Sequence, residues 1–108
     1  MAIKLSLGNI MGVPVKGVET GETGAPEHFE FTLFCKRLNV HEIGEAAVGR
    51  LPSEFLRHVT EGWKSVLDQD GRSVPFSAGA LEELLLRPGL AELASLAYLK
   101  EYQAREKN

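Results

Sequence analysis

The run Asp68-Gln69-Asp70-Gly71 could hold a calcium ion, because calcium loops alternate acidic side chains ahead of a glycine turn. If Gly71 took the sixth loop position, Asp68 and Asp70 would take the third and fifth. The first position would then be Val66 and the twelfth Ser77, and neither side chain is a carboxylate. The sequence therefore predicts a solvated acidic turn here and no metal site.

Other side chains capable of chemistry lack the partners that chemistry needs. His28, His41 and His58 are not paired at metal-ligand spacing, and no cysteine pair accompanies them. Cys35, the single cysteine, lies in an apolar run, whereas a nucleophile needs a histidine partner and an exposed, electropositive setting. The acidic pair Glu82-Glu83 is expected on a solvent face. Since no phosphate loop, nucleophile elbow or Ser-His-Asp arrangement occurs, we expect a protein that is not an enzyme and has no catalytic residue, cofactor or small-molecule substrate.

Length and charge narrow the class further. The chain has 108 residues, a hydrophobic fraction of 44% and a net charge of −3, which suit one globular domain. Basic residues do not cluster, so the sequence predicts no nucleic-acid partner. The N-terminus lacks the apolar core of a signal peptide, and no window approaches 18 apolar residues. We therefore expect a cytoplasmic protein that does not enter a membrane.

Hydropathy alternation in residues 1–38 predicts a small antiparallel sheet. Strands are expected at 3–7, 13–19 and 28–36, with a long polar loop over 19–28. In the third segment, Phe29, Phe31, Leu33 and Cys35 fall on one face. The pattern predicts an α+β fold, in which this sheet precedes a mostly helical half over residues 39–108.

That half begins with two predicted helices. Residues 39–51 form a weak candidate, because each internal glycine costs roughly 1 kcal/mol relative to alanine. Residues 52–63 form a stronger one, for which Ser53 is the expected N-cap and Gly62 the expected stop.

The stretch EGWKSVLDQDGRSVPFS, residues 61–77, predicts a hairpin that joins the two halves of the fold. Gly71 tolerates the positive φ that a tight turn needs. Trp63 and Phe76 are expected to pin the hairpin between sheet and helices. Ser77 is the expected N-cap of the helix that follows, which ends near Pro88.

The C-terminal segment LEELLLRPGLAELASLAYL has more leucine than one core contact needs. Helical spacing places Leu90, Leu93 and Ala97 on one strip, and Leu96, Leu99 and Tyr102 on another. We expect one strip to cover the sheet and the other to meet a partner. The candidate partner-binding residues are Leu85, Leu90, Leu93, Leu96, Leu99 and Tyr102.

The order of these elements resembles the tail assembly chaperones of long-tailed bacteriophages. In that family a segment of the type gWxxVxDxxGxxVPFS precedes a leucine-rich helix. The resemblance covers about residues 29–102, and the matching positions are Gly62, Trp63, Val66, Asp68, Gly71, Val74, Pro75, Phe76 and Ser77. It implies that the chain binds the tape measure protein, keeps it from aggregating until the tail tube forms, and is absent from the finished virion.

Two other interpretations of the sequence remain open. The chain could be a structural phage protein, such as a tail or head-joining subunit, that remains in the virion. It could also be a stand-alone protein-binding module from a prophage or a host gene. The partner of a structural phage protein would be another tail protein, and that of a stand-alone module an unrelated protein. In each case the chain could also form a homo-oligomer.

Overall fold

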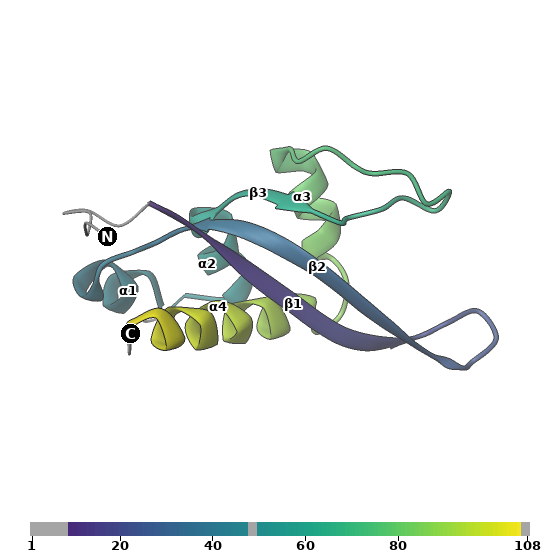
Figure 1. Ribbon diagram of the computed structural model, residues 1–108, viewed down its shortest axis with the longest axis horizontal. Helices are drawn as coiled ribbons and strands as arrows, with labels where there is room; N and C mark the ends of the chain where they lie inside the picture. Colours follow the sequence, from purple (N-terminus) through teal and green to yellow (C-terminus); the bar gives the residue numbers. More distant parts are fainter. Residues whose placement is uncertain (1–8, 48–49, 107–108) are drawn as a thin grey trace, which may run out of the picture.

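The computed structural model describes residues 9–47 and 50–106, and it shows an α+β domain in which helices pack on an antiparallel sheet (Figure 1). The sheet order is β1-β2-β3. This arrangement confirms the predicted fold class. The elements are β1 (Ile10–Thr20), β2 (Pro26–Lys36), α1 (Val40–Ala47), α2 (Pro52–Val59), β3 (Thr60–Lys64), α3 (Ala78–Leu85) and α4 (Leu90–Glu106).

β1 and β2 form one long hairpin, with Met11 opposite Cys35 and Val15 opposite Phe31. The predicted alternation is confirmed, because side chains of one face are buried along both strands. The connecting loop is shorter than expected, since pairing continues to the ends of both strands and only residues 21–25 turn. Gly24 supplies the positive φ, 83°, that the turn uses. The strand predicted at 3–7 lies outside the described residues.

A third strand, β3, corrects the prediction of a helix over residues 52–63. The helix ends at Val59, and Thr60 is already extended at φ −80° and ψ 125°. β3 then pairs antiparallel with the second half of β2, so Gly62 is a strand residue and not a helix stop. β-Branched Thr60 and aromatic Trp63 suit a pleated strand, and the vacant edge of β2 supplies the backbone partners.

The start of α2 also differs from the prediction. Leu51 occupies the N-cap position without a side-chain hydrogen bond, and Pro52 is the first helical residue. Proline suits that place, because its fixed φ matches the helix and its missing N–H would have no partner there. Ser53 therefore lies inside the first turn and is not the cap.

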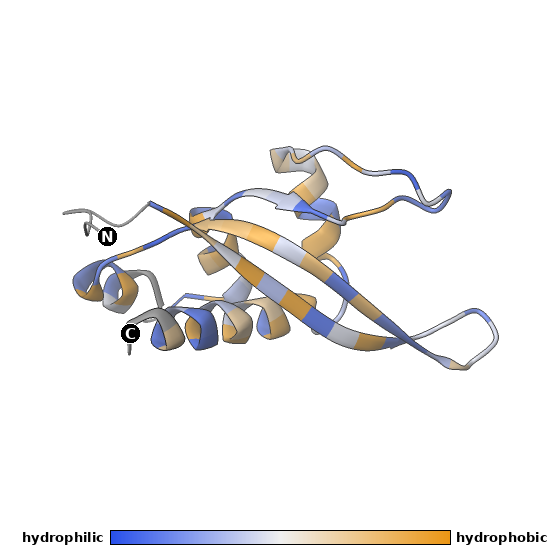
Figure 2. Cartoon of the chain, in the orientation of Figure 1, coloured by the Kyte–Doolittle hydropathy of each residue, from blue (hydrophilic) through white to orange (hydrophobic). Residues whose placement is uncertain are grey.

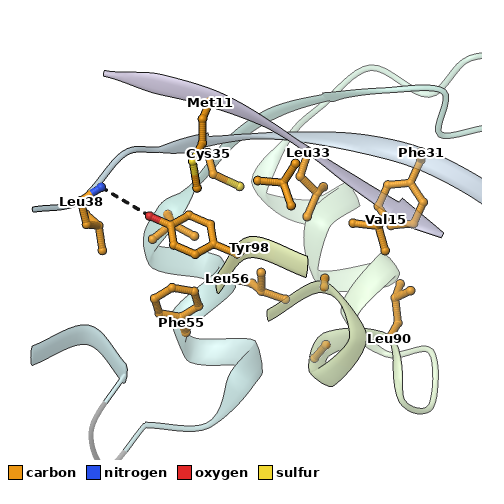
Figure 3. Close-up of a cluster of buried hydrophobic side chains, with 14 residues drawn as sticks. Met11, Val15, Phe31, Leu33, Cys35, Leu38, Phe55, Leu56, Leu90 and Tyr98 are labelled. Carbon is orange, nitrogen blue, oxygen red and sulfur yellow. Dashed lines mark hydrogen bonds between the residues drawn. The ribbon is translucent and has the colours of Figure 1, made fainter. Parts of the chain in front are cut away.

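The core lies between the sheet and the helices α2 and α4 (Figure 3). Side chains of β1 and β2 point toward those helices, and Tyr98 of α4 lies at the centre with none of its surface exposed. Hydropathy along the hairpin alternates as this one-sided burial requires (Figure 2). The buried members are Met11, Val13, Val15, Phe31, Leu33, Cys35, Leu38, Phe55, Leu56, Val59, Leu90, Ala91, Ala94 and Tyr98.

Ion pairs on the surface link the helices to their neighbours. Arg57 of α2 contacts Glu82 of α3 with an N–O distance of 2.6 Å. Arg87, in the turn between α3 and α4, pairs with Glu19 of β1. These groups are partly exposed, so each pair adds little to stability.

None of the described helices combines the length and the apolar character needed to cross a bilayer.

A candidate protein-binding surface

The predicted hairpin over residues 61–77 is present. Val74 N donates to Val66 O at 2.8 Å, and the indole Nε1 of Trp63 donates to Val74 O, also at 2.8 Å. The rings of Trp63 and Phe76 meet edge to face with centroids 5.1 Å apart. Trp63 is half-buried and packs against the core, so it pins the returning segment to the sheet as expected.

The acidic turn at the tip of this hairpin organises its own backbone. Oδ1 of Asp68 accepts hydrogen bonds from the N–H groups of Asp70 at 2.9 Å and Arg72 at 3.0 Å. Gly71 has a φ of 78°, as the turn prediction required. Beyond the hairpin, Ser77 is the N-cap of α3, since its Oγ accepts from Ala80 N at 3.0 Å. These polar groups shape the chain locally.

The cysteine is a core residue and not a nucleophile. Cys35 has no exposed surface, and its sulfur lies 3.9 Å from Oγ1 of Thr60. Burial raises the pKa of the Cys35 thiol to about 12, so the thiolate is scarcely populated at neutral pH. His28, His41 and His58 are exposed, whereas the sulfur is buried. Within residues 9–47 and 50–106, no three potential metal ligands come together.

The face of α4 toward the sheet is made of Leu90, Ala91, Ala94 and Tyr98, all buried. The two alanines bring the helix axis close to the sheet, because they have no bulk beyond Cβ. Leu90 is only 6% exposed, which corrects its assignment as a partner-binding residue. A partner cannot reach its side chain without opening the core.

Beside this buried face, α4 and the edge strand β1 enclose a shallow groove. Leu93, Leu96 and Ala97 supply an apolar floor and wall from α4, and Pro14 faces them from β1. Leu96 is 66% exposed, and together with Leu93 and Ala97 it makes a contiguous apolar surface. Three charged residues flank the apolar part of the groove, namely Lys16, Lys100 and Glu101. Ala104 is the remaining lining residue.

A glycine in β1 sets how close α4 lies to the strand. A Cβ atom at Gly17 would stand 2.5 Å from Cζ of Phe29 and 3.0 Å from Cδ2 of Leu93. The first distance is shorter than Cβ contacts allow, so Phe29 would have to shift, and the second would push Leu93 away by a few tenths of an ångström. Gly17 therefore lets Phe29 and Leu93 pack closely against β1 beside the groove.

The two leucine strips predicted on α4 regroup in the structure. Leu93, Leu96 and Ala97 line one groove together, although the sequence placed Leu96 on the other strip. Leu99 and Tyr102 are half-buried against the core, and Tyr102 stacks on Tyr98 with ring centroids 6.2 Å apart. Leu85 of α3 is half-buried as well. Of the predicted contact residues, the groove therefore brings together only Leu93 and Leu96.

Besides Leu51 before α2, which is 63% exposed, two other exposed leucines were not singled out from the sequence. Leu86 follows α3 and is 81% exposed, and Leu67 in the 61–77 hairpin is 57% exposed. Neither lines the groove between β1 and α4. Periodicity cannot assign them, because both lie outside regular helix or strand, where no repeating pattern applies.

In comparisons with protein-family models, with curated proteins and with solved structures, nothing matches this chain. A function is therefore inferred from the groove between β1 and α4.

Proposed function

We propose that the chain is a non-catalytic, protein-binding tail assembly chaperone that holds an apolar helical segment of a phage tape measure protein. The observation that supports this most directly is Leu96, 66% exposed above a groove that Leu93 and Ala97 make apolar. Covering a leucine of this exposure yields roughly 1.5 to 3 kcal/mol, the scale of a contact that matters for affinity.

The shape of the groove favours a helix as the partner over an extended strand. The inner flank is the edge of β1, where Pro14 faces the groove and has no N–H to offer. An added strand would lose its ladder at that point, whereas a helix needs only apolar contacts at positions three and four apart. Tape measure proteins are long helical chains, which fits such a site.

The charged rims support reversible binding in water. Lys16 and Lys100 flank the apolar residues, and the net charge of the chain is −3. A chaperone needs solvated charged residues around its apolar contact, because it must release its partner when the tail tube forms. On this proposal the protein acts in the cytoplasm of the bacterial host and is absent from the finished virion.

The test is co-expression with the long helical reading frame that a chaperone gene should precede. We expect the soluble fraction of that long protein to rise several-fold with the wild-type chain. Leu96→Asp places a charge in the groove and should abolish most of this gain. The variant should keep the wild-type melting temperature within about 2 °C, because Leu96 is mostly in water.

Leu86→Asp is the matched control, since it puts the same charge on a leucine that is more exposed and outside the groove. It should hold the long protein in solution as the wild type does. Equal loss in both variants would contradict the groove as the binding site. Recovery of the chain in purified virions at stoichiometric amounts would contradict the chaperone role and favour a structural tail or head-joining subunit.

A further inference from the structure

β3 covers only part of the edge of β2. It pairs with residues Thr32–Cys35, and after Lys64 the chain turns away at Ser65, whose φ is 66°. From Pro26 to Phe31, no strand among the described residues pairs with β2 on that side. Figure 1 shows this end of the hairpin extending past the helices. The sheet therefore has a vacant edge several residues long.

The register of the hairpin shows which backbone groups face that vacancy. Arg37 N donates to Asn9 O at 2.6 Å, and Gly21 N donates to Ala25 O at 2.9 Å, at the two ends of the hairpin. Since bonds alternate along an antiparallel pair, the odd-numbered residues of β2 bond to β1. The N–H and C=O groups of His28 and Glu30 consequently point to the vacant edge.

The opposite edge, on β1, also has no outer strand partner within residues 9–47 and 50–106, and it is unsuited to strand pairing. The same alternation directs the backbone of even-numbered residues outward there, and one of them is Pro14, which has no N–H. Lys16 is the next outward position along β1. A proline and a lysine are common protections of an edge strand, and residues 27–31 of β2 contain neither. Of the two sheet edges that the described strands present, the one on β2 is therefore the one open to pairing.

We propose that a second copy of this chain pairs antiparallel with this edge, with Phe29 on the two-fold axis. In that register His28 lies opposite the partner's Glu30, and Glu30 opposite the partner's His28. The two pairs exchange backbone hydrogen bonds, and each sets an imidazole beside a carboxylate. The edge is thus complementary to itself, as a two-fold interface requires.

Neighbouring registers fail on the same geometry. An axis at Glu30 sets two carboxylates opposite each other and needs Thr32, which already pairs with Lys64. An axis at His28 sets Glu30 opposite the partner's Pro26, which has no N–H to donate, and sets two imidazoles side by side. Only the register around Phe29 satisfies both the hydrogen bonds and the charges.

The outer face of the paired edges is also consistent in charge. Nζ of Lys16 lies 3.9 Å from Oε1 of Glu30 within one chain. Pairing extends this row to Lys16, Glu30 and the partner's His28, so the carboxylate lies between two groups that can donate to it. Because the shared segment is short, the dimer is weak and forms only at high protein concentration.

Sedimentation velocity over a concentration series tests the proposal. The wild-type chain should shift from monomer toward dimer as concentration rises. His28→Pro removes one outward N–H and leaves the ladder to β1 intact, so it should abolish the shift. Val18→Pro is the matched control, because Val18 lies opposite His28 and its N–H faces the other edge. It should dimerise like the wild type, and circular dichroism verifies that both variants fold.

Charge exchange tests the register itself. His28→Glu sets two carboxylates opposite each other and Glu30→Lys sets an ammonium group opposite an imidazole, so each change should weaken self-association about tenfold. In an equimolar mixture of these two variants, one pair sets a carboxylate opposite an ammonium group and the other sets the original carboxylate opposite His28, so a heterodimer should form. Wild type that stays monomeric, association that survives His28→Pro in a folded chain, or a mixture that fails to associate would each overturn the proposal. The edge would then be open to an extended segment of another protein.

Discussion

The hydroxyl of Tyr98 donates a 2.8 Å hydrogen bond to the backbone carbonyl of Lys36, and so fastens α4 to the end of β2. The same oxygen accepts from Leu38 N at 3.4 Å. Phe55 of α2 meets the Tyr98 ring edge to face, with centroids 5.0 Å apart. One buried side chain thus joins the sheet, α2 and α4, and it satisfies two backbone groups where the strand ends.

Tyr98→Phe should lower the free energy of unfolding by about 1 to 3 kcal/mol. The ring still fills its place, but the carbonyl of Lys36 loses its side-chain donor and the N–H of Leu38 loses its acceptor. Urea denaturation followed by circular dichroism measures the change. Tyr102→Phe is the control, because Tyr102 is half-buried and makes only ring contacts among the described residues. Its cost should stay within about 0.5 kcal/mol, and an equal loss in both variants would show that the Tyr98 hydroxyl bonds contribute nothing specific.

Alkaline pH should destabilise the domain through two buried acids. Burial raises the pKa of the Tyr98 hydroxyl from 10.0 to about 12 and that of the Cys35 thiol from 9.0 to about 12. As pH rises, both groups therefore lose their protons at a lower pH in the unfolded chain than in the folded chain. Stability is therefore unaffected below about pH 9 and declines as pH rises toward about 12.

Melting temperatures at about pH 8 and pH 10.5 measure this decline. Cys35→Ala removes the group with the larger shift and should make the decline shallower, although it leaves a small cavity that lowers stability at every pH. The expected signature is therefore a smaller difference between the two pH values. A variant whose melting temperature falls as steeply as that of the wild type would show that the thiol does not titrate with unfolding.

Local patterns predicted the parts of the fold that neighbouring residues determine. Alternation in residues 28–36 identified the buried face of β2, and Ser77 was recognised as a cap because its hydroxyl reaches its own helix. β3 was missed, because its partner is β2, about thirty residues earlier in the chain. A five-residue strand carries too little alternation to be distinguished from the end of a helix.

The groove could be predicted only in part for a similar reason. Helical spacing places Leu93 and Ala97 on one side of α4 and Leu99 and Tyr102 on another, so one core contact can hardly bury both sets. It does not show which side of α4 lies along β1 and which along α2, since the path of distant segments decides that. Ser95, for example, donates to Pro52 O at 3.4 Å, which places that side of α4 against α2. Leu96 therefore belongs to the β1 side, with Leu93.

Trp63→Ala should lower the free energy of unfolding by about 2 to 3 kcal/mol. The indole is half-buried, so the loss is smaller than for a fully buried tryptophan, but the contact with Phe76 and the bond to Val74 O are lost as well. Leu67→Ala on the same hairpin is the control, since Leu67 is 57% exposed, and its cost should be within about 0.5 kcal/mol. Thermal melts of both variants that coincide with the wild type would contradict the pinning role of Trp63.

The two aspartates of the acidic turn should differ, although they are two residues apart and both exposed. Oδ1 of Asp68 accepts hydrogen bonds from two backbone N–H groups. Asp70 contributes one of these donors, its own backbone N–H. Asp68→Ala should therefore cost about 1 kcal/mol, and Asp70→Ala about 0.5 kcal/mol or less. Asp68→Asn keeps an acceptor oxygen and should recover most of the loss.

Chemical denaturation of the three variants, with and without millimolar calcium, separates a turn from a metal site. A ligand that binds the folded state must raise its stability, so we expect no effect of calcium on any chain. A calcium-dependent rise in the wild type that disappears in both Asp68→Asn and Asp70→Ala would show that the two carboxylates act together on an ion.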